Sequence, residues 1–161
     1  MVSKSHASLL NAQQVLLRKM IKDEQQSYMQ VKPLLLQQHA RLHAAAMFNS
    51  VDWSYQDEVL ADVPTDWMRL MPKGEDPSIA WLLWHLTRCE DITMNLLVAE
   101  TDQVLISGGW QEKLNTTWRD TGNAMSSQEI TAFSQRIDLE ALFNYRIAVG
   151  RQIREIIKRL D

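Results

Sequence analysis

Apolar residues recur every three or four positions through most of this chain, and that helical spacing constrains the fold more than any other feature. Residues that break helices are scarce, because only five glycines and four prolines occur among the 161 residues. Runs in which apolar and polar residues alternate, as they do in a half-buried strand, are nearly absent. We therefore expect an all-α fold rather than a sheet architecture.

Length and composition predict one domain. Hydrophobic residues make up 45% of the chain and charged residues 23%, which is ordinary for a globular protein and argues against disorder. A chain of 161 residues is close to the usual size of one domain and can bury most of its apolar surface. We therefore interpret residues 1–161 as a single helical domain.

Charge and cysteine content argue against several partners and locations. The formal net charge is −3 and the basic residues are scattered among acids, so nucleic acid is not an expected partner. Cys89 is the only cysteine, and the first residues lack the basic and apolar regions of a secretory signal, so we expect a cytoplasmic protein. Apolar stretches such as Ile79 to Leu86 fall well short of the roughly 20 residues that a membrane span needs.

A proline divides the first helical region in two. Inside a helix, proline removes a backbone donor and clashes with the preceding turn, whereas in the first turn it costs little. We therefore predict one helix from about Ser8 to Gln30, and a second that Pro33 opens and that runs from Leu34 to about Met47.

The clearest helix start is Asp76-Pro77, an acid that can cap followed by a proline that suits the first turn. We expect this helix to reach about Ala99 and to lie at the centre of the fold. The segment between Phe48 and Gly74 should carry one or two short helices. The central helix has apolar residues around much of its surface, namely Ile79, Leu82, Leu83, Leu86, Cys89, Met94 and Leu97.

Later helices carry their own start signals. Gly108 and Gly109 should break regular structure before a short helical turn. Ser126 with Glu129 three residues later has the form of a capping box, and Asp138 should cap the last long helix.

Histidines are the best candidates for chemistry in this chain. His39 and His43 are four residues apart, so on a helix both imidazoles share a face and can bind one transition metal. His85 lies on the central helix with Cys89 one turn further along, and imidazole with thiolate suits zinc. Carboxylates that could complete such a site are Asp57, Glu58, Glu90 and Asp91.

Taken alone, these spacings favour a structural role. His39 and His43 can simply pack or form hydrogen bonds, and His85 and Cys89 can be ordinary core residues. The sequence has no Gly-rich phosphate loop and no GxSxG, HExxH or CxxC motif, which argues against nucleotide chemistry and the common hydrolase sites.

The segment SIAWLLWHLTRCEDITMNLLVA, residues 78–99, resembles the DinB-like superfamily, whose hallmark is an apolar helix with one histidine followed by an acid about a turn later. The preceding segments PKGEDPSIAW and DEVLADVPTDWMRLMP are also similar to that family, and the resemblance covers roughly Leu9 to Leu160. The match centres on Trp81, Trp84, His85, Glu90 and Asp91.

The resemblance implies a four-helix bundle with a long crossover, often dimeric, and a divalent metal held by three histidines. His85 matches the family's central histidine. The family's other two ligands stand four residues apart on the last helix, where this chain has Tyr145, Arg146 and Gly150 within NYRIAVGRQI. Either the bundle is shortened at its C-terminus with an incomplete site, or His39 and His43 substitute for the missing pair.

Two functional hypotheses follow. In the first, His85 with His43 or His39 holds a zinc, nickel or iron ion in a metal-dependent transferase or hydrolase that acts on a small-molecule thiol, as related branches of the family do. In the second, the chain is a non-catalytic helical bundle, a dimerising structural or stress-response protein with a degenerate metal site. Both predict a homodimer.

Overall fold

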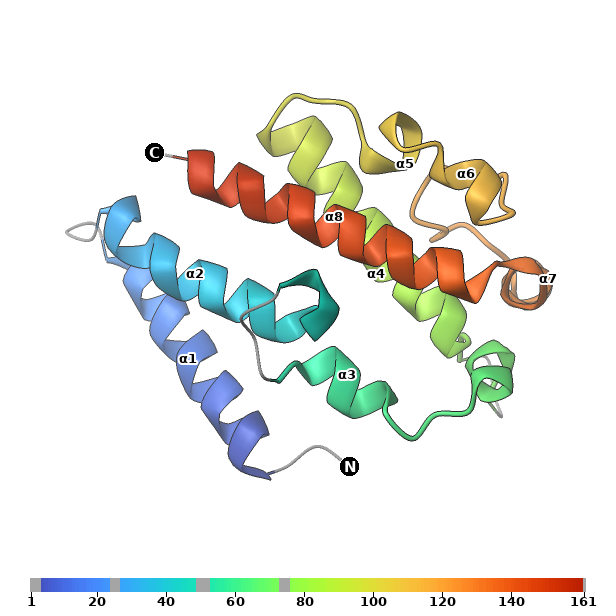
Figure 1. Cartoon of the computed structure of the whole chain (residues 1–161), viewed down its shortest axis with the longest axis horizontal. Helices are drawn as coiled ribbons and strands as arrows, with labels where there is room; N and C mark the ends of the chain where they lie inside the picture. The colour runs from blue at the N-terminus through green and yellow to red at the C-terminus, as the bar shows by residue number, and fades with distance from the viewer. Residues whose placement is uncertain (1–3, 24–26, 49–52, 73–75, 161) are drawn as a thin grey trace. The chain divides into compact units, whose positions relative to one another are not determined.

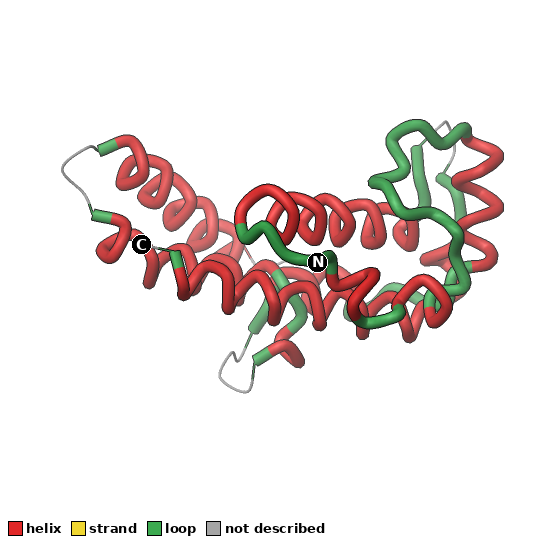
Figure 2. The backbone as a smooth tube through the Cα atoms, turned by 90° about the horizontal axis from the view of Figure 1, so that it is seen from above, coloured by secondary structure: helices red, strands yellow, loops and turns green. Residues whose placement is uncertain are grey.

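The computed structural model describes residues 4–23, 27–48, 53–72 and 76–160. Its regular elements are helices, and no strand occurs within these ranges (Figure 2), so the all-α prediction is confirmed. None of the helices in these ranges combines the length and apolar character needed to cross a bilayer. The chain divides into two compact units, of which the first comprises residues 1–62 and 154–161 and the second residues 63–153.

The first unit is built on a pair of helices, α1 (Lys4–Lys22) and α2 (Tyr28–Leu42), which lie side by side (Figure 1). The short helices η1 (Ala45–Met47) and α3 (Tyr55–Leu60) follow. The end of α8 (Leu139–Arg159) also belongs to this unit, because the Tyr28 hydroxyl donates to the Ile157 carbonyl at 3.0 Å.

The start of α2 corrects the expectation that Pro33 opens a helix. The helix begins at Tyr28, and Pro33 lies inside it. Ser27 precedes the first turn, and its backbone N–H donates to Oε1 of Gln30 at 2.9 Å, which supports a start five residues earlier than predicted. Pro33 costs this helix the backbone bond that its missing N–H would have made to the Met29 carbonyl, and its ring crowds that same carbonyl.

The second unit is organised around α4 (Ile79–Asp91), which begins two residues later than Asp76-Pro77 suggested. Ser78, not Asp76, is the cap, because its hydroxyl accepts the N–H of Trp81 at 3.0 Å. The helix continues toward the predicted end, but from Ile92 to Val98 it widens into a π-helical segment, η3, in which the N–H of Ala99 reaches the carbonyl of Met94 at 3.0 Å. The remaining elements of this unit are η2 (Thr65–Arg69), α5 (Val104–Ser107), α6 (Trp110–Lys113), α7 (Ser127–Arg136) and the first part of α8.

The apolar positions that were expected to bury α4 on most sides are only partly buried: Leu83 lies in the core, whereas three other leucines do not. Leu82, Leu86 and Leu97, which the apolar pattern assigned to the core, are 41%, 49% and 74% exposed. The opposite face of the helix is buried instead, and half of it is polar. Its residues are Ala80, Trp81, Leu83, Trp84, Thr87, Arg88, Asp91 and, in η3, Asn95.

The later start signals are confirmed. Ser126 and Glu129 form a capping box at the start of α7, and Asp138 accepts the N–H of Ala141 at 2.8 Å at the start of α8. The glycine pair separates α5 from α6. Buried apolar side chains from these helices form the core of the second unit with Trp84, among them Leu105, Leu114, Phe133, Ile137, Leu142 and Val149.

Candidate functional site

His85 sits on α4 with its ring in a defined tautomer. Nδ1 lies 2.6 Å from the backbone carbonyl oxygen of Thr121. A carbonyl oxygen can only accept a hydrogen bond, so Nδ1 carries the proton. The other nitrogen, Nε2, therefore presents a lone pair when the imidazole is neutral, and that lone pair can accept a proton or bind a metal ion.

The orientation of the His85 ring is fixed by an aromatic neighbour. The indole of Trp81, one turn earlier on α4, stacks on the imidazole with ring centroids 4.7 Å apart and an interplanar angle of 6°. Trp81 is buried, and its indole nitrogen lies 3.1 Å from the sulfur of Met125. Stacking and the Nδ1 hydrogen bond together leave the imidazole little freedom to rotate.

Gly122 allows the loop before α7 to reach α4. Its φ of +76° lies in the left-handed region, and a Cβ there would stand 2.6 Å from Cζ3 of Trp84. Its N–H donates to Oδ1 of Asp120 at 2.7 Å, which closes a tight turn. This turn brings the neighbouring Thr121 carbonyl to Nδ1 of His85.

Cys89 faces the open nitrogen of His85. Its Sγ lies 3.7 Å from Nε2, and both side chains are half-buried. Burial raises the pKa of the Cys89 thiol, and the charge of Glu90 raises it further, although Arg88 opposes both. The thiol is therefore protonated at neutral pH, and its S–H can donate to Nε2 of His85. It is a weak nucleophile in this state.

His39 and His43 lie together in the first unit. Their ring centroids are 4.4 Å apart with an interplanar angle of 41°, so the expected pairing of the two imidazoles is present. His43 stands just after the last residue of α2 and is buried, and its N–H donates to the His39 carbonyl at 3.3 Å. Because His85 belongs to the second unit, its partnership with these two histidines stays a prediction.

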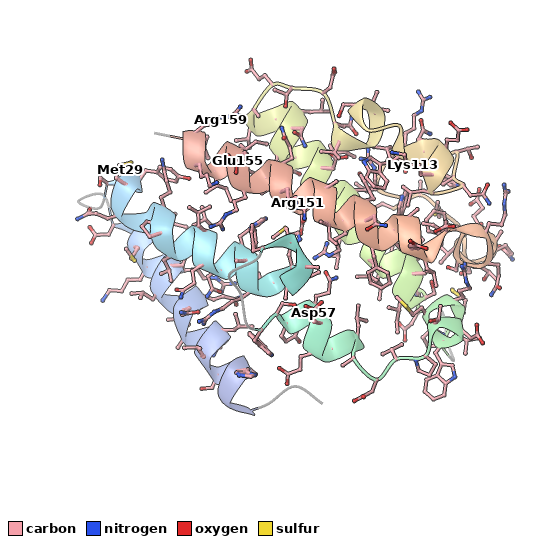
Figure 3. All side chains as sticks on the ribbon, viewed as in Figure 1. Met29, Asp57, Lys113, Arg151, Glu155 and Arg159 are labelled. Carbon is pink, nitrogen blue, oxygen red and sulfur yellow. The ribbon has the colours of Figure 1, made fainter. Side chains whose placement is uncertain are left out.

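The candidate carboxylates of the first unit hold structural contacts. Asp57 (Figure 3) accepts the backbone N–H of Ala45 at 2.7 Å and so ties α3 to η1. Glu58 Oε2 accepts from Nδ1 of His6 at 3.0 Å and also from the indole of Trp53. These hydrogen bonds give both carboxylates a structural role that needs no metal ion.

Sequence reasoning missed a buried polar cluster that includes Arg88 and Asp91 of α4. The guanidinium of Arg88 donates to Oδ2 of Asp91 at 2.7 Å and to the Tyr145 hydroxyl at 2.8 Å. Tyr145 in turn donates to the same carboxylate oxygen at 2.5 Å. The one sequence signal for this cluster was the presence of an arginine and an aspartate three residues apart on a helix.

The same carboxylate organises the chain beyond η3. Asp91 accepts the backbone N–H groups of Val104 and Leu105 at 2.8 and 2.9 Å, so it caps α5. The side-chain amide of Asn95 donates to Asp91 Oδ1 at 2.8 Å. Asp91 thus serves as a structural acceptor for three different segments.

Tyr145 and Arg146 stand where the family resemblance led us to look for histidines. Burial raises the pKa of Tyr145, so the phenol remains protonated and stays within the Arg88 and Asp91 cluster. The Arg146 guanidinium is buried and lies 3.8 Å from Oε1 of Glu90. Neither side chain is a metal donor in this arrangement.

A groove on the second unit lies apart from His85. It has a volume of about 620 Å³ and runs between α6 and α8, with Lys113 and Arg151 among its lining residues (Figure 3). The Lys113 ammonium lies 4.5 Å above the Trp110 ring and donates to the Gly108 carbonyl at 2.9 Å. Neither His85 nor Cys89 lines this groove.

The donors around His85 fit part of a metal shell. Nε2 of His85 and Sγ of Cys89 can both bind one ion, with the imidazole already held by its other nitrogen. Within either unit, no three side chains of His, Cys, Asp or Glu gather closely enough among the described residues to hold a metal by themselves. Two protein donors are therefore what this structure offers on α4.

No family model matches the chain, and no curated protein sequence matches it at a significant level.

Proposed function

We propose that the chain is a DinB-like, divalent-metal-dependent transferase or hydrolase in which Nε2 of His85 is a metal ligand. The observation that carries the proposal is the hydrogen bond from Nδ1 to the Thr121 carbonyl at 2.6 Å. Histidines that bind metals almost always donate their second ring nitrogen to a carbonyl or carboxylate, which fixes the tautomer and makes the ligand more basic.

The surroundings of His85 support the same role. The ring is held by stacking on Trp81, and the residue is only half-buried. A bound divalent ion would lower the pKa of a water or thiol held on it. We propose His43 or His39 as the further imidazole, a small-molecule thiol as substrate, and a cytoplasmic homodimeric four-helix bundle as the setting.

One set of observations favours a second candidate function, a non-catalytic bundle that dimerises. The last helix has a tyrosine and an arginine, Tyr145 and Arg146, where the resemblance expects histidines. Both side chains are bonded to neighbouring residues of the fold. Leu82, Leu86 and Leu97 are exposed on α4 and η3, and exposed apolar side chains are typical of self-association surfaces.

Metal analysis separates the two candidates. The full chain is purified without a metal-affinity tag, loaded with Zn²⁺, Ni²⁺ or Fe²⁺, desalted, and its metal content measured. The first proposal expects one ion per chain, lost in His85→Asn, a variant whose amide can still donate to the Thr121 carbonyl but has no donor at the place of Nε2. His6→Asn, a histidine bonded to Glu58, is the matched control and keeps the ion. A chain that retains no metal under any loading condition supports the non-catalytic bundle.

A further inference from the structure

We propose that Cys89 is the second protein ligand of the ion bound by His85, and that this histidine and thiolate pair makes the site select zinc over magnesium, manganese and calcium. The inference rests on the proposed function and adds the identity of the metal to it. It assigns a donor that the three-histidine pattern of the family resemblance does not contain.

The distance between the two donor atoms matches a zinc site. A tetrahedral zinc with Zn–N near 2.05 Å and Zn–S near 2.3 Å holds its nitrogen and sulfur ligands about 3.6 Å apart. In this structure Nε2 of His85 and Sγ of Cys89 are 3.7 Å apart. The separation of the two donor atoms is therefore the one that a shared zinc ion requires.

The two donors are held in place before any ion binds. Residues four apart on an α-helix lie one above the other on the same face, and both belong to the regular part of α4. The imidazole is fixed by Trp81 and by the Thr121 carbonyl, so its lone pair cannot turn away from Cys89. Little side-chain freedom remains to be lost on binding.

The charged side chains next to Cys89 on α4, Arg88 and Glu90, interact with other residues of the protein. The guanidinium of Arg88 is buried in the cluster with Asp91, and Oε1 of Glu90 lies 3.8 Å from the Arg146 guanidinium. The side chains of His85 and Cys89 are half-buried, so the remaining coordination positions are open to water or to a thiol substrate.

The chemistry of the pair sets the metal preference. When the ion binds, the Cys89 S–H bond breaks, its proton passes to solvent, and the sulfur electron pair forms the bond to the metal. The charge of the site then falls from +2 to +1, with no oxidation or reduction. Thiolate and imidazole favour zinc, whereas magnesium, manganese and calcium favour oxygen ligands.

Cobalt(II) binding to the full chain provides the test. A thiolate on Co²⁺ gives a sulfur-to-cobalt charge-transfer band in the near ultraviolet, separate from the visible d–d bands that report any cobalt site. We expect the charge-transfer band in the unmodified chain and its loss in Cys89→Ser, with the d–d bands retained. Zinc affinity, measured by competition with a chromophoric chelator, should fall in Cys89→Ser by more than the about 100-fold that loss of an outer-shell partner alone can cost.

The outcomes distinguish this inference from the proposal on which it rests. Cobalt binding that depends on His85 but shows no charge-transfer band, with equal zinc affinity in Cys89→Ser, overturns the ligand role of Cys89 and leaves the metal site standing. Binding that His85→Asn does not weaken overturns both. Cys89→Ala serves as a second variant, and circular dichroism with the urea midpoint confirms that each variant is folded.

Discussion

Two pairs of polar residues on α4 have similar spacing in the sequence but different burial in the structure. Arg88 and Asp91, three residues apart, are fully buried, and their charged groups bond to each other and to neighbouring segments. His85 and Cys89, four residues apart, are half-buried, and their donor atoms face each other 3.7 Å apart. The first pair is part of the buried core, and the second is partly exposed to solvent.

The degree of burial explains why the charged groups of Arg88 and Asp91 need many partners and the donor atoms of His85 and Cys89 do not. Removing a charge from water costs several kcal/mol, so a fully buried ion pair persists only when further hydrogen bonds satisfy its remaining donors and acceptors. Asp91 meets this requirement with backbone groups of α5 and with Tyr145, and nothing is left over for a ligand. A half-buried pair remains partly hydrated, so Nε2 of His85 does not need a further hydrogen-bond partner from the protein.

The largest expected effect comes from breaking the buried pair. Asp91→Ala leaves the Arg88 charge buried without its carboxylate and removes the cap of α5. Such changes typically cost about 3–5 kcal/mol. We therefore expect urea unfolding to show a loss of this size, or the chain to be unfolded at room temperature.

Asp102→Asn is the matched control for Asp91→Ala, because it alters an aspartate near the same segment that is exposed. We expect its urea midpoint to equal that of the unmodified chain. An Asp91→Ala variant whose midpoint is also unchanged contradicts the structural role of the cluster.

The second-largest effect is expected at Gly122, in the loop whose Thr121 carbonyl bonds to His85. Gly122→Ala puts an alanine in the left-handed region, at φ +76°, and places its Cβ 2.6 Å from Cζ3 of Trp84. Gly109→Ala also puts an alanine in the left-handed region, at φ +61°, but the space around its Cβ is open. The strain alone costs about 1–2 kcal/mol, and overpacking adds about 1–3 kcal/mol. The difference between the two free energies of unfolding measures the contact between this loop and Trp84. Equal losses in the two variants show that the loop does not press on α4.

A smaller effect concerns the phenol within the buried cluster. Tyr145→Phe removes the hydroxyl that donates to Asp91 and accepts from Arg88, and we expect a loss of about 1–3 kcal/mol near neutral pH. The matched measurement is urea unfolding of the unmodified chain at the same pH. A Tyr145→Phe variant that loses no stability contradicts the hydrogen bonds assigned to this hydroxyl.

The same residue predicts a pH dependence. Burial raises the folded-state pKa of Tyr145 above the ordinary value of 10.0. Above pH 10 the unfolded chain therefore loses a proton that the folded chain keeps, so stability falls as pH rises, by about 1.4 kcal/mol per pH unit from this residue. The decline should be shallower by that amount in Tyr145→Phe. Parallel curves for the two proteins above pH 10 contradict the raised pKa.

Local signals in the sequence predicted many of the helices. The capping box at Ser126 and Glu129 and the cap at Asp138 act within one turn, so residue types alone reveal them. Pro33 misled the prediction because α2 continues through it, despite the lost backbone bond and the crowding of the preceding turn.

Contacts between distant segments escaped sequence reasoning. Counting apolar positions placed Leu82 and Leu86 in the core, because the pattern cannot show that Arg88 and Asp91 find partners there. Tyr145 lies 54 residues after Asp91 in the chain, so no spacing rule links them. The spacing of His85 and Cys89 was visible, but a backbone carbonyl, such as the one that orients His85, carries no residue-type signal.

The smallest effect on folding should come from the pair proposed to bind the metal. In metal-free protein, Cys89→Ser removes one weak contact between half-buried groups, and we expect it to change the free energy of unfolding by no more than about 1 kcal/mol. His85→Asn also removes the stacking on Trp81, and we expect a loss of no more than about 2 kcal/mol. Near-neutral stability combined with loss of metal binding marks residues that serve a ligand. A loss comparable to that of Asp91→Ala means instead that this pair is also required for folding, and the contrast between the two pairs disappears.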